Sequence, residues 1–111
     1  MTIAEVLKAT SAHTGIPVQE LTGPMRSKPV VRARQLAQLM ARMHVKTPSG
    51  KPPSFPVIAR AFGGRDHSTV QHGVTTALKL IDDDADFRRH AASLNSKLMA
   101  DDSAGGHWGR V

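Results

Sequence analysis

The chain has 111 residues, of which 40% are apolar, and this length and composition fit one small domain with a single core. It contains no cysteine, which excludes disulfides and thiolate metal sites and is typical of a reducing compartment. The net charge is +6, no stretch approaches the roughly 20 apolar residues that cross a bilayer, and the N-terminus does not resemble a signal peptide, so we expect a cytoplasmic protein with no membrane partner.

The N-terminal part predicts one long helix, one short helical turn and a loop. The long helix is expected over residues 3–13, where Thr2 and Glu5 have the spacing of a capping box. Residues 18–21 predict one short helical turn, and 23–29, with a glycine, two prolines and a serine, predict a loop.

The middle of the chain predicts two further helices. The apolar spacing over 31–44 indicates a long helix with the stripe Leu36, Leu39, Met40 and Met43. The stretch 45–54 is rich in proline, glycine and serine and predicts an exposed loop. Ser54 is placed to cap a short helix that runs through Phe62, with Pro56 tolerated in its first turn.

A further helix is predicted to begin after Gly63 and Gly64, with Asp66 as its N-cap. Gly73 lies inside this helix, where glycine costs about 1 kcal/mol relative to alanine. This cost indicates close backbone approach by a neighbour, with sequence drift as the alternative. The apolar residues that recur at helical spacing are Val70, Val74, Ala77, Leu78 and Ile81.

The C-terminal part predicts one last helix over 85–99, after the aspartate run at 82–84, and then a flexible tail over 100–111 that contains Trp108. No repeat and no convincing strand is present. The predicted fold class is therefore all-α, a small helical bundle of about five or six helices that forms one domain over 1–99.

The positive charge is concentrated in one part of the chain. No acidic residue lies between Glu20 and Asp66. That interval holds Arg26, Lys28, Arg32, Arg34, Arg42, Lys46, Lys51, Arg60 and Arg65, whereas acids gather at Asp82, Asp83, Asp84 and Asp86. A solubilising surface normally mixes both signs, so this one-sided stretch favours a polyanionic partner.

The segment GGRDHSTVQHG at 63–73 gathers polar residues that fit neither catalysis nor metal binding. Asp66, His67 and Ser68 are the residue types of a hydrolase triad, but consecutive residues at a helix start fan out by about 100° each and do not converge. His67 and His72 diverge by roughly 140° around a helix, so they do not form a metal site. We therefore expect no enzyme, no metal site and no cofactor.

Two interpretations of the segment remain, a helix cap alone or the reading end of a helix. A cap explains Asp66 but not His67 and Ser68, which follow Arg65 in a basic protein. A short helix, a glycine-containing turn and a longer helix describe a helix-turn-helix, whose second helix enters the DNA major groove by its N-terminal residues. There, Asp accepts from cytosine, His contacts guanine or thymine, and Ser binds bases or phosphates.

The residues also resemble a known family. The segment IARAFGGRDHSTVQHG closely resembles the signature of the C-terminal DNA-binding domain, domain IV, of the bacterial replication initiator DnaA family. The stretch RSKPVVRARQLAQLMAR resembles the basic loop of that domain and the helix after it. The likeness spans about residues 3–99 and implies a Trp-repressor-like helical domain that binds the short, asymmetric DnaA box in double-stranded DNA.

The resemblance implies a role for individual residues. Arg26 matches the basic-loop arginine that enters the minor groove, and Asp66, His67 and Ser68 match positions that read bases in the major groove. The residues expected near the phosphate backbone are Arg34, Gln35, Thr69 and His72, with Lys28, Arg32 and Arg65 as further candidates.

The chain departs from the family pattern in four respects. Ser68 stands where the family often has threonine and lacks the methyl group that touches thymine. Thr75 and Thr76 stand where basic residues are frequent, which predicts weaker, less salt-dependent binding. The loop at 45–54 is longer than usual. No G-x-x-x-x-G-K-[ST] phosphate loop occurs, so we expect a free-standing DNA-binding domain without ATPase activity.

Two functions follow from these observations. The first is sequence-specific binding to DnaA-box-like sites in the nucleoid, which regulates replication initiation or transcription. The second is an interaction protein that contacts DnaA or its AAA+ regulators, suggested by Thr75, Thr76, the long loop and the tail with Trp108. An enzyme has almost no support, because no acid, base and nucleophile converge.

Overall fold

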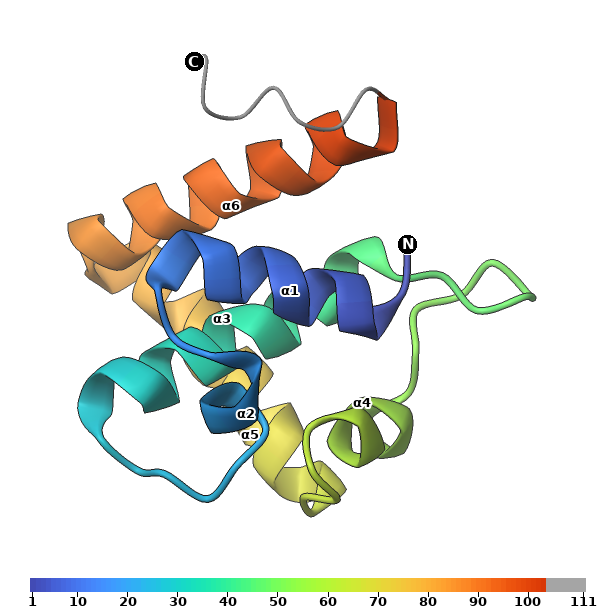
Figure 1. Cartoon of the computed structure of the whole chain (residues 1–111), viewed down its shortest axis with the longest axis horizontal. Coiled ribbons are helices and arrows are strands. Elements are labelled where there is room, and N and C mark those ends of the chain that lie inside the picture. Colours follow the sequence, from blue (N-terminus) through green and yellow to red (C-terminus); the bar gives the residue numbers. More distant parts are fainter. Residues whose placement is uncertain (104–111) are drawn as a thin grey trace.

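The computed structural model describes the backbone of residues 1–103 and the side chains of residues 1–100. This part of the chain contains six helices and no strand, as the sequence predicts for an all-α bundle (Figure 1). The helices are α1 (Ile3–Thr14), α2 (Val18–Leu21), α3 (Lys28–His44), α4 (Phe55–Ala61), α5 (His67–Asp83) and α6 (Ala85–Ser103).

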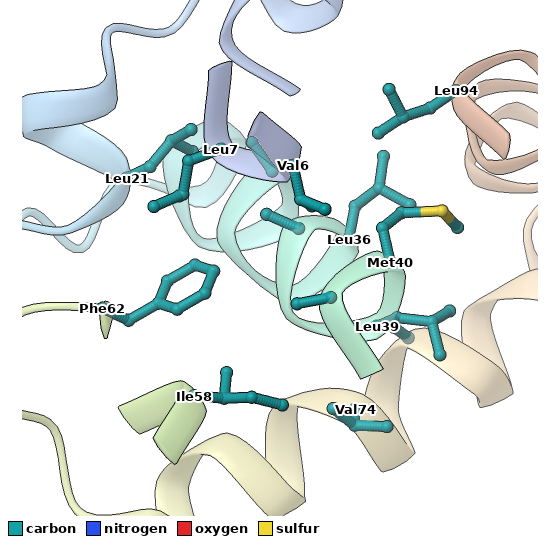
Figure 2. Packing of buried hydrophobic residues seen from close by; sticks show 14 of the residues in the cluster. Val6, Leu7, Leu21, Leu36, Leu39, Met40, Ile58, Phe62, Val74 and Leu94 are labelled. Carbon is teal, nitrogen blue, oxygen red and sulfur yellow. The ribbon is translucent and has the colours of Figure 1, made fainter. Parts of the chain in front are cut away.

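Helix α3 is the centre of the bundle and packs against each of the other five helices. Its stripe residues Leu36, Leu39 and Met40 are almost fully buried and point to different neighbours (Figure 2). The short elements contribute to the same core, because Leu21 at the end of α2 and Phe62 after α4 have no exposed surface. These two side chains fix the segments on either side of the candidate site, since burial of a large apolar side chain contributes roughly 1.5–3 kcal/mol.

The predicted stripes are correct except at two positions. Met43 in α3 and Leu78 in α5 were expected to face the core, but 49% and 51% of their surfaces are exposed. In α3 every residue from Leu36 to Ala41 is buried, and Met43 lies beyond this section, in the last turn of the helix. In α5 the buried residues Val70, Gly73, Val74 and Ala77 form one face, and Leu78 lies outside it. Isolated exposed apolar side chains of this kind are common on protein surfaces.

Helix starts follow the predicted caps. At α1, the Thr2 hydroxyl accepts from the Glu5 amide at 3.1 Å and the Glu5 carboxylate accepts from the Thr2 amide at 2.7 Å, which completes the capping box. At α4, Ser54 Oγ accepts from the Val57 amide at 3.4 Å. Helix α3 begins three residues before the predicted start, because Pro29 fits within the first helical turn.

The close approach predicted at Gly73 is confirmed. A Cβ atom built on Gly73 would lie 2.3 Å from Gln38 Oε1 and 3.6 Å from Gln35 Cγ, both on α3. Glycine therefore lets α5 pack directly on the central helix, which fixes the direction of its N-terminal end.

The C-terminal helix is longer than predicted. Helix α6 continues to Ser103, where the sequence analysis places a tail from residue 100. The rest of the predicted tail, including Trp108, lies outside the described residues. Within residues 1–103, no helix is long and apolar enough to cross a membrane.

Candidate nucleic-acid interface

The N-terminal end of α5 is capped by Asp66 as predicted. Its carboxylate Oδ1 accepts from the Ser68 amide at 2.7 Å, and its carbonyl accepts from the Thr69 amide at 3.0 Å. The hydrogen bonds from Ser68 lower the pKa of the Asp66 carboxyl group, so this group is charged at neutral pH. The cap leaves the carboxylate at the surface, with 68% of the side chain exposed.

The side chains that follow the cap project into solvent. His67 is 61% exposed, and its Nδ1 lies 3.9 Å from Asp66 Oδ1. Ser68 and Thr69 are also exposed, whereas Val70 is fully buried and holds the helix against the core. His72 lies one turn further along and is exposed as well. The predicted residues of α5 thus form one accessible polar helix end.

The turn before α5 depends on two glycines. Gly63 and Gly64 have φ angles of 87° and 77°, in the left-handed region that favours glycine. The amides of Gly64 and Arg65 both donate to the Ala59 carbonyl, at 3.0 and 3.1 Å, which ends α4. Helices α4 and α5 with this turn form the helix-turn-helix.

The 22–27 loop lies against this turn. A Cβ atom on Gly63 would lie only 2.2 Å from the carbonyl oxygen of Thr22, so only glycine fits at this contact. The guanidinium of Arg65 donates to the carbonyl of Gly23 in the same loop. The predicted minor-groove residue Arg26 and the backbone candidate Lys28 are both exposed, in this loop and at the start of α3.

Arg34 requires a correction. The sequence analysis places it at the phosphate backbone, but only 6% of its surface is exposed. Its Nε donates to the Leu21 carbonyl at 2.8 Å, and its terminal Nη2 lies 2.9–3.0 Å from three more carbonyl oxygens. These belong to Glu20, Gly23 and Met25. The guanidinium is committed to the loop backbone and does not reach the surface as a phosphate contact would.

The other backbone candidates have intermediate positions. Arg32 and Gln35 are half-buried, and an Arg32 guanidinium nitrogen donates to Gln35 Oε1 at 2.9 Å. Arg65 is half-buried, and both burial and the nearby charge of Arg26 lower the pKa of its guanidinium. Burial and the charge of Arg65 lower the pKa of Arg34 in the same way. Arg34 and Arg65 lie close together, because both donate to the Gly23 carbonyl.

The lysines and arginines of the basic stretch form no ion pair with the described carboxylates. Asp86 pairs with Arg89 in α6, and the carboxylate of Asp66 lies 3.9 Å from His67 Nδ1, so neither carboxylate pairs with a lysine or arginine between 26 and 65. Uncompensated cations of this kind raise the local positive potential and attract an anionic partner.

One basic residue near the site was not predicted. Arg60 in the last turn of α4 is exposed and lines a shallow hollow with Pro56, Asp66 and His67. The sequence did contain a signal for Arg60, because this residue lies in the acid-free stretch, one helical turn before Gly63 and Gly64. The first helix of a helix-turn-helix crosses the DNA backbone, so Arg60 is a further candidate for a phosphate contact.

The described side chains show no grouping of metal ligands. Among residues 1–100, no three His, Asp or Glu side chains lie together as a metal site would need.

Comparison with known proteins assigns the family. The model of the bacterial dnaA protein helix-turn-helix matches residues 3–76. The chain belongs to this family. It is 33% identical over 100 residues to the chromosomal replication initiator protein DnaA of Cereibacter sphaeroides, covering 90% of this chain and 21% of the relative.

Other DnaA relatives give the same picture. The chain is 38% identical over 87 residues to DnaA of Acinetobacter baumannii, covering 78% of this chain and 17% of the relative. It is 34% identical over 102 residues to DnaA of Agrobacterium fabrum, covering 92% of this chain and 20% of the relative. The chain thus spans about a fifth of the length of the curated relatives it matches, and this part corresponds to the C-terminal domain of DnaA.

Proposed function

We propose that the chain binds double-stranded DNA sequence-specifically at DnaA-box-like sites and thereby regulates replication initiation or transcription. The observation that carries this proposal is the exposed N-terminal end of α5, beside a basic loop, in a member of the DnaA helix-turn-helix family. Capped polar helix ends in this motif enter the major groove.

Base recognition is assigned to four residues. Asp66, His67 and Ser68 contact base edges in the major groove, where the Asp66 carboxylate accepts from a cytosine amino group. His67 donates to guanine or contacts thymine. Arg26 extends from the 22–27 loop into the adjacent minor groove, whose negative potential attracts guanidinium groups.

Backbone contacts fix the orientation of the protein on the duplex. These are assigned to Lys28, Arg32, Gln35, Arg65, Thr69 and His72, with Arg60 added on α4. Arg34 is left out because its guanidinium is buried. Each neutralised phosphate adds to the salt dependence of binding, with a slope of about −0.9 per contact.

The affinity is expected to be lower than in relatives that carry basic residues at 75 and 76. Thr75 is exposed, and its hydroxyl donates to the Gln71 carbonyl of the same helix at 3.0 Å. It therefore presents no positive charge to a phosphate group. Ser68 keeps the hydroxyl of threonine without its methyl group, so discrimination of thymine is weaker.

The proposed action is occupancy of sites and not ATP hydrolysis. The 111 residues contain no G-x-x-x-x-G-K-[ST] motif, and the matched family model describes a helix-turn-helix. We expect these 111 residues to act by occupying DnaA-box-like sites on the nucleoid in the cytoplasm.

A competition assay tests this proposal. Binding of the 111-residue chain to a duplex with a DnaA box and to a scrambled duplex is measured across a salt series. The expected result is at least about a 10³-fold preference for the box near physiological salt. Equal affinity for both duplexes at every salt concentration contradicts sequence-specific binding.

A second candidate function is favoured by a groove that α5 does not line. Helices α1, α3 and α6 enclose a largely apolar groove of about 310 Å³, with Ile16, Leu36 and Phe87 among its lining residues. A groove of this kind suits a side chain of a protein partner, such as DnaA or an AAA+ regulator of it. A pull-down after nuclease treatment tests this function, and failure to recover an ATPase partner counts against it.

A further inference from the structure

We propose that Arg34 and Arg65 are positioning residues that fix the 22–27 loop to the helix-turn-helix and thereby set the minor-groove preference of Arg26. This inference rests on the proposed function. It replaces the phosphate contact expected for Arg34 with an internal role, and it assigns Arg65 a second role inside the protein.

The hydrogen bonds of Arg34 determine the path of the loop. Its guanidinium is bonded to the carbonyls of Glu20, Leu21, Gly23 and Met25, four of the six residues from 20 to 25. Buried carbonyl groups need a partner, so this one side chain satisfies a segment that forms no regular ladder. Met25 directly precedes Arg26, so the last bonded carbonyl lies one residue from the base-reading side chain.

Arg65 joins the same loop to the recognition helix. Its guanidinium donates to the Gly23 carbonyl, which is also bonded to Arg34. Arg65 directly precedes the N-cap Asp66, and the contact of Gly63 with the Thr22 carbonyl adds a second point of attachment. A displacement of the 22–27 loop therefore changes the distance between Arg26 and His67, the two residues assigned to different grooves.

Two nitrogens of the Arg34 guanidinium share the four carbonyls, Nε with Leu21 and Nη2 with Glu20, Gly23 and Met25. Arginine has five N–H donors in a rigid plane, whereas the lysine ammonium has three donors on one atom. Arg34→Lys keeps the charge but leaves at least one of the four carbonyls without its partner. We expect the fold to persist and the loop to lose its fixed conformation.

The same helix supplies a matched control. Arg42 on α3 donates to the Pro53 carbonyl at 2.6 Å and so holds the 45–54 loop, which carries none of the residues assigned to bases. Arg42→Lys therefore makes the same substitution on the same helix, at an arginine that bonds to a different loop, without touching the 22–27 loop.

The experiment compares base discrimination in the two grooves. Inosine in place of guanine removes only the minor-groove amino group, so a series of such duplexes locates the base pair at which Arg26→Ala abolishes discrimination. Arg34→Lys is expected to reduce discrimination at that pair by about fivefold or more. At the base pair whose discrimination depends on His67, Arg34→Lys is expected to stay within about twofold of the parent chain. Arg42→Lys is expected to stay within about twofold of the parent chain at every base pair.

Two results overturn the proposal. One is an Arg34→Lys chain that folds and keeps full minor-groove discrimination, and the other is an equal loss in both grooves, which indicates general damage. If Arg34→Lys does not fold, the half-exposed Arg65→Lys takes its place with the same expected result.

A measurement without DNA separates this inference from the proposed function. Trypsin cleaves after Arg26 only when the loop leaves its fixed conformation, so initial cleavage of the Arg26–Ser27 bond is followed by mass spectrometry. Arg34→Lys is expected to accelerate this cleavage about tenfold or more relative to Arg42→Lys. An unchanged rate contradicts the positioning role, whereas failure of box recognition by the parent chain contradicts only the proposed function.

Discussion

The two loops at the ends of α3 use the same kind of contact for different purposes. Arg34 bonds to four carbonyls at residues 20–25, whereas Arg42 donates to the Pro53 carbonyl and lies 4.6 Å from the centre of the Phe55 ring. In Figure 1 the 22–27 loop and the 45–54 loop lie on opposite sides of the view. The first is joined to the turn before α5 and the second is not.

The comparison shows that charge alone does not define the candidate interface. Both segments are basic, with Arg26 and Lys28 at one and Lys46 and Lys51 at the other, and all four residues are exposed. Only the first pair is held in a fixed relation to the N-terminal end of α5. We therefore expect the two sets of cations to contribute differently to DNA binding.

The largest expected effect comes from the junction of the 22–27 loop with the turn. Gly64→Ala places alanine in a left-handed conformation with nothing within 4 Å, which costs about 1–2 kcal/mol of unfolding free energy. Gly63→Ala adds a clash with the Thr22 carbonyl, which costs about 1–3 kcal/mol more. Urea unfolding of both variants measures the difference, and equal losses would show that the junction is not tightly packed.

The second effect concerns salt dependence. Lys28→Ala is expected to reduce the slope of log K against log salt by about 0.9, because one phosphate contact is lost. Lys46→Ala, in the other loop, serves as the matched control and is expected to leave the slope unchanged. If both variants flatten the slope equally, the protein binds DNA through diffuse charge and the contrast between the loops is wrong.

A smaller effect is expected when the 45–54 loop is shortened. Its tip is a local turn in which the Thr47 amide donates to the Lys51 carbonyl at 2.9 Å and the Gly50 amide donates to the Thr47 carbonyl at 2.8 Å. Deletion of residues 48–50 is expected to change the unfolding free energy by less than about 1 kcal/mol, since loop-closure entropy varies slowly with length. Affinity for the box duplex is expected to stay the same, and a loss measured by titration would place this loop in the interface.

The smallest effect is on the pH dependence of stability. Burial, with the charges of His90 and Lys97, lowers the pKa of His13 below its ordinary value of 6.5. As the pH falls, His13 is therefore protonated at a higher pH in the unfolded chain than in the folded chain. Stability is lost as the pH falls from 6.5 toward the folded-state pKa of His13. Melting temperatures from pH 7.5 to 5 are expected to fall less steeply for His13→Gln than for the control His72→Gln. Identical pH profiles would show that His13 does not couple to folding.

Much of the fold follows from local sequence signals. Capping residues such as Thr2, Ser54 and Asp66 mark helix starts because their side chains satisfy amides that the helix leaves unpaired. Gly73 marks a close contact between α5 and α3 because glycine is otherwise costly inside a helix. Such signals depend only on nearby residues, which is why they can be predicted from the sequence.

The buried position of Arg34 was not foreseen, for a physical reason. The family resemblance assigns this residue to the phosphate backbone, and the loop carbonyls that surround it become visible only when the chain is folded. Its spacing held a signal, because Arg34 lies four residues after Val30 and three before Ala37, both of which are buried. An arginine on the buried stripe of an amphipathic helix predicts internal carbonyl partners rather than an exposed contact.

The most direct measurement of the central claim is base discrimination by His67→Ala. A panel of duplexes with single base-pair changes is titrated against the parent chain and the variant, with His72→Ala as the control at a proposed phosphate contact. We expect His67→Ala to lose about 1–3 kcal/mol of discrimination at one base pair only, while His72→Ala weakens binding to every duplex by a similar factor. If His67→Ala instead lowers affinity for all duplexes equally, the exposed end of α5 does not read bases.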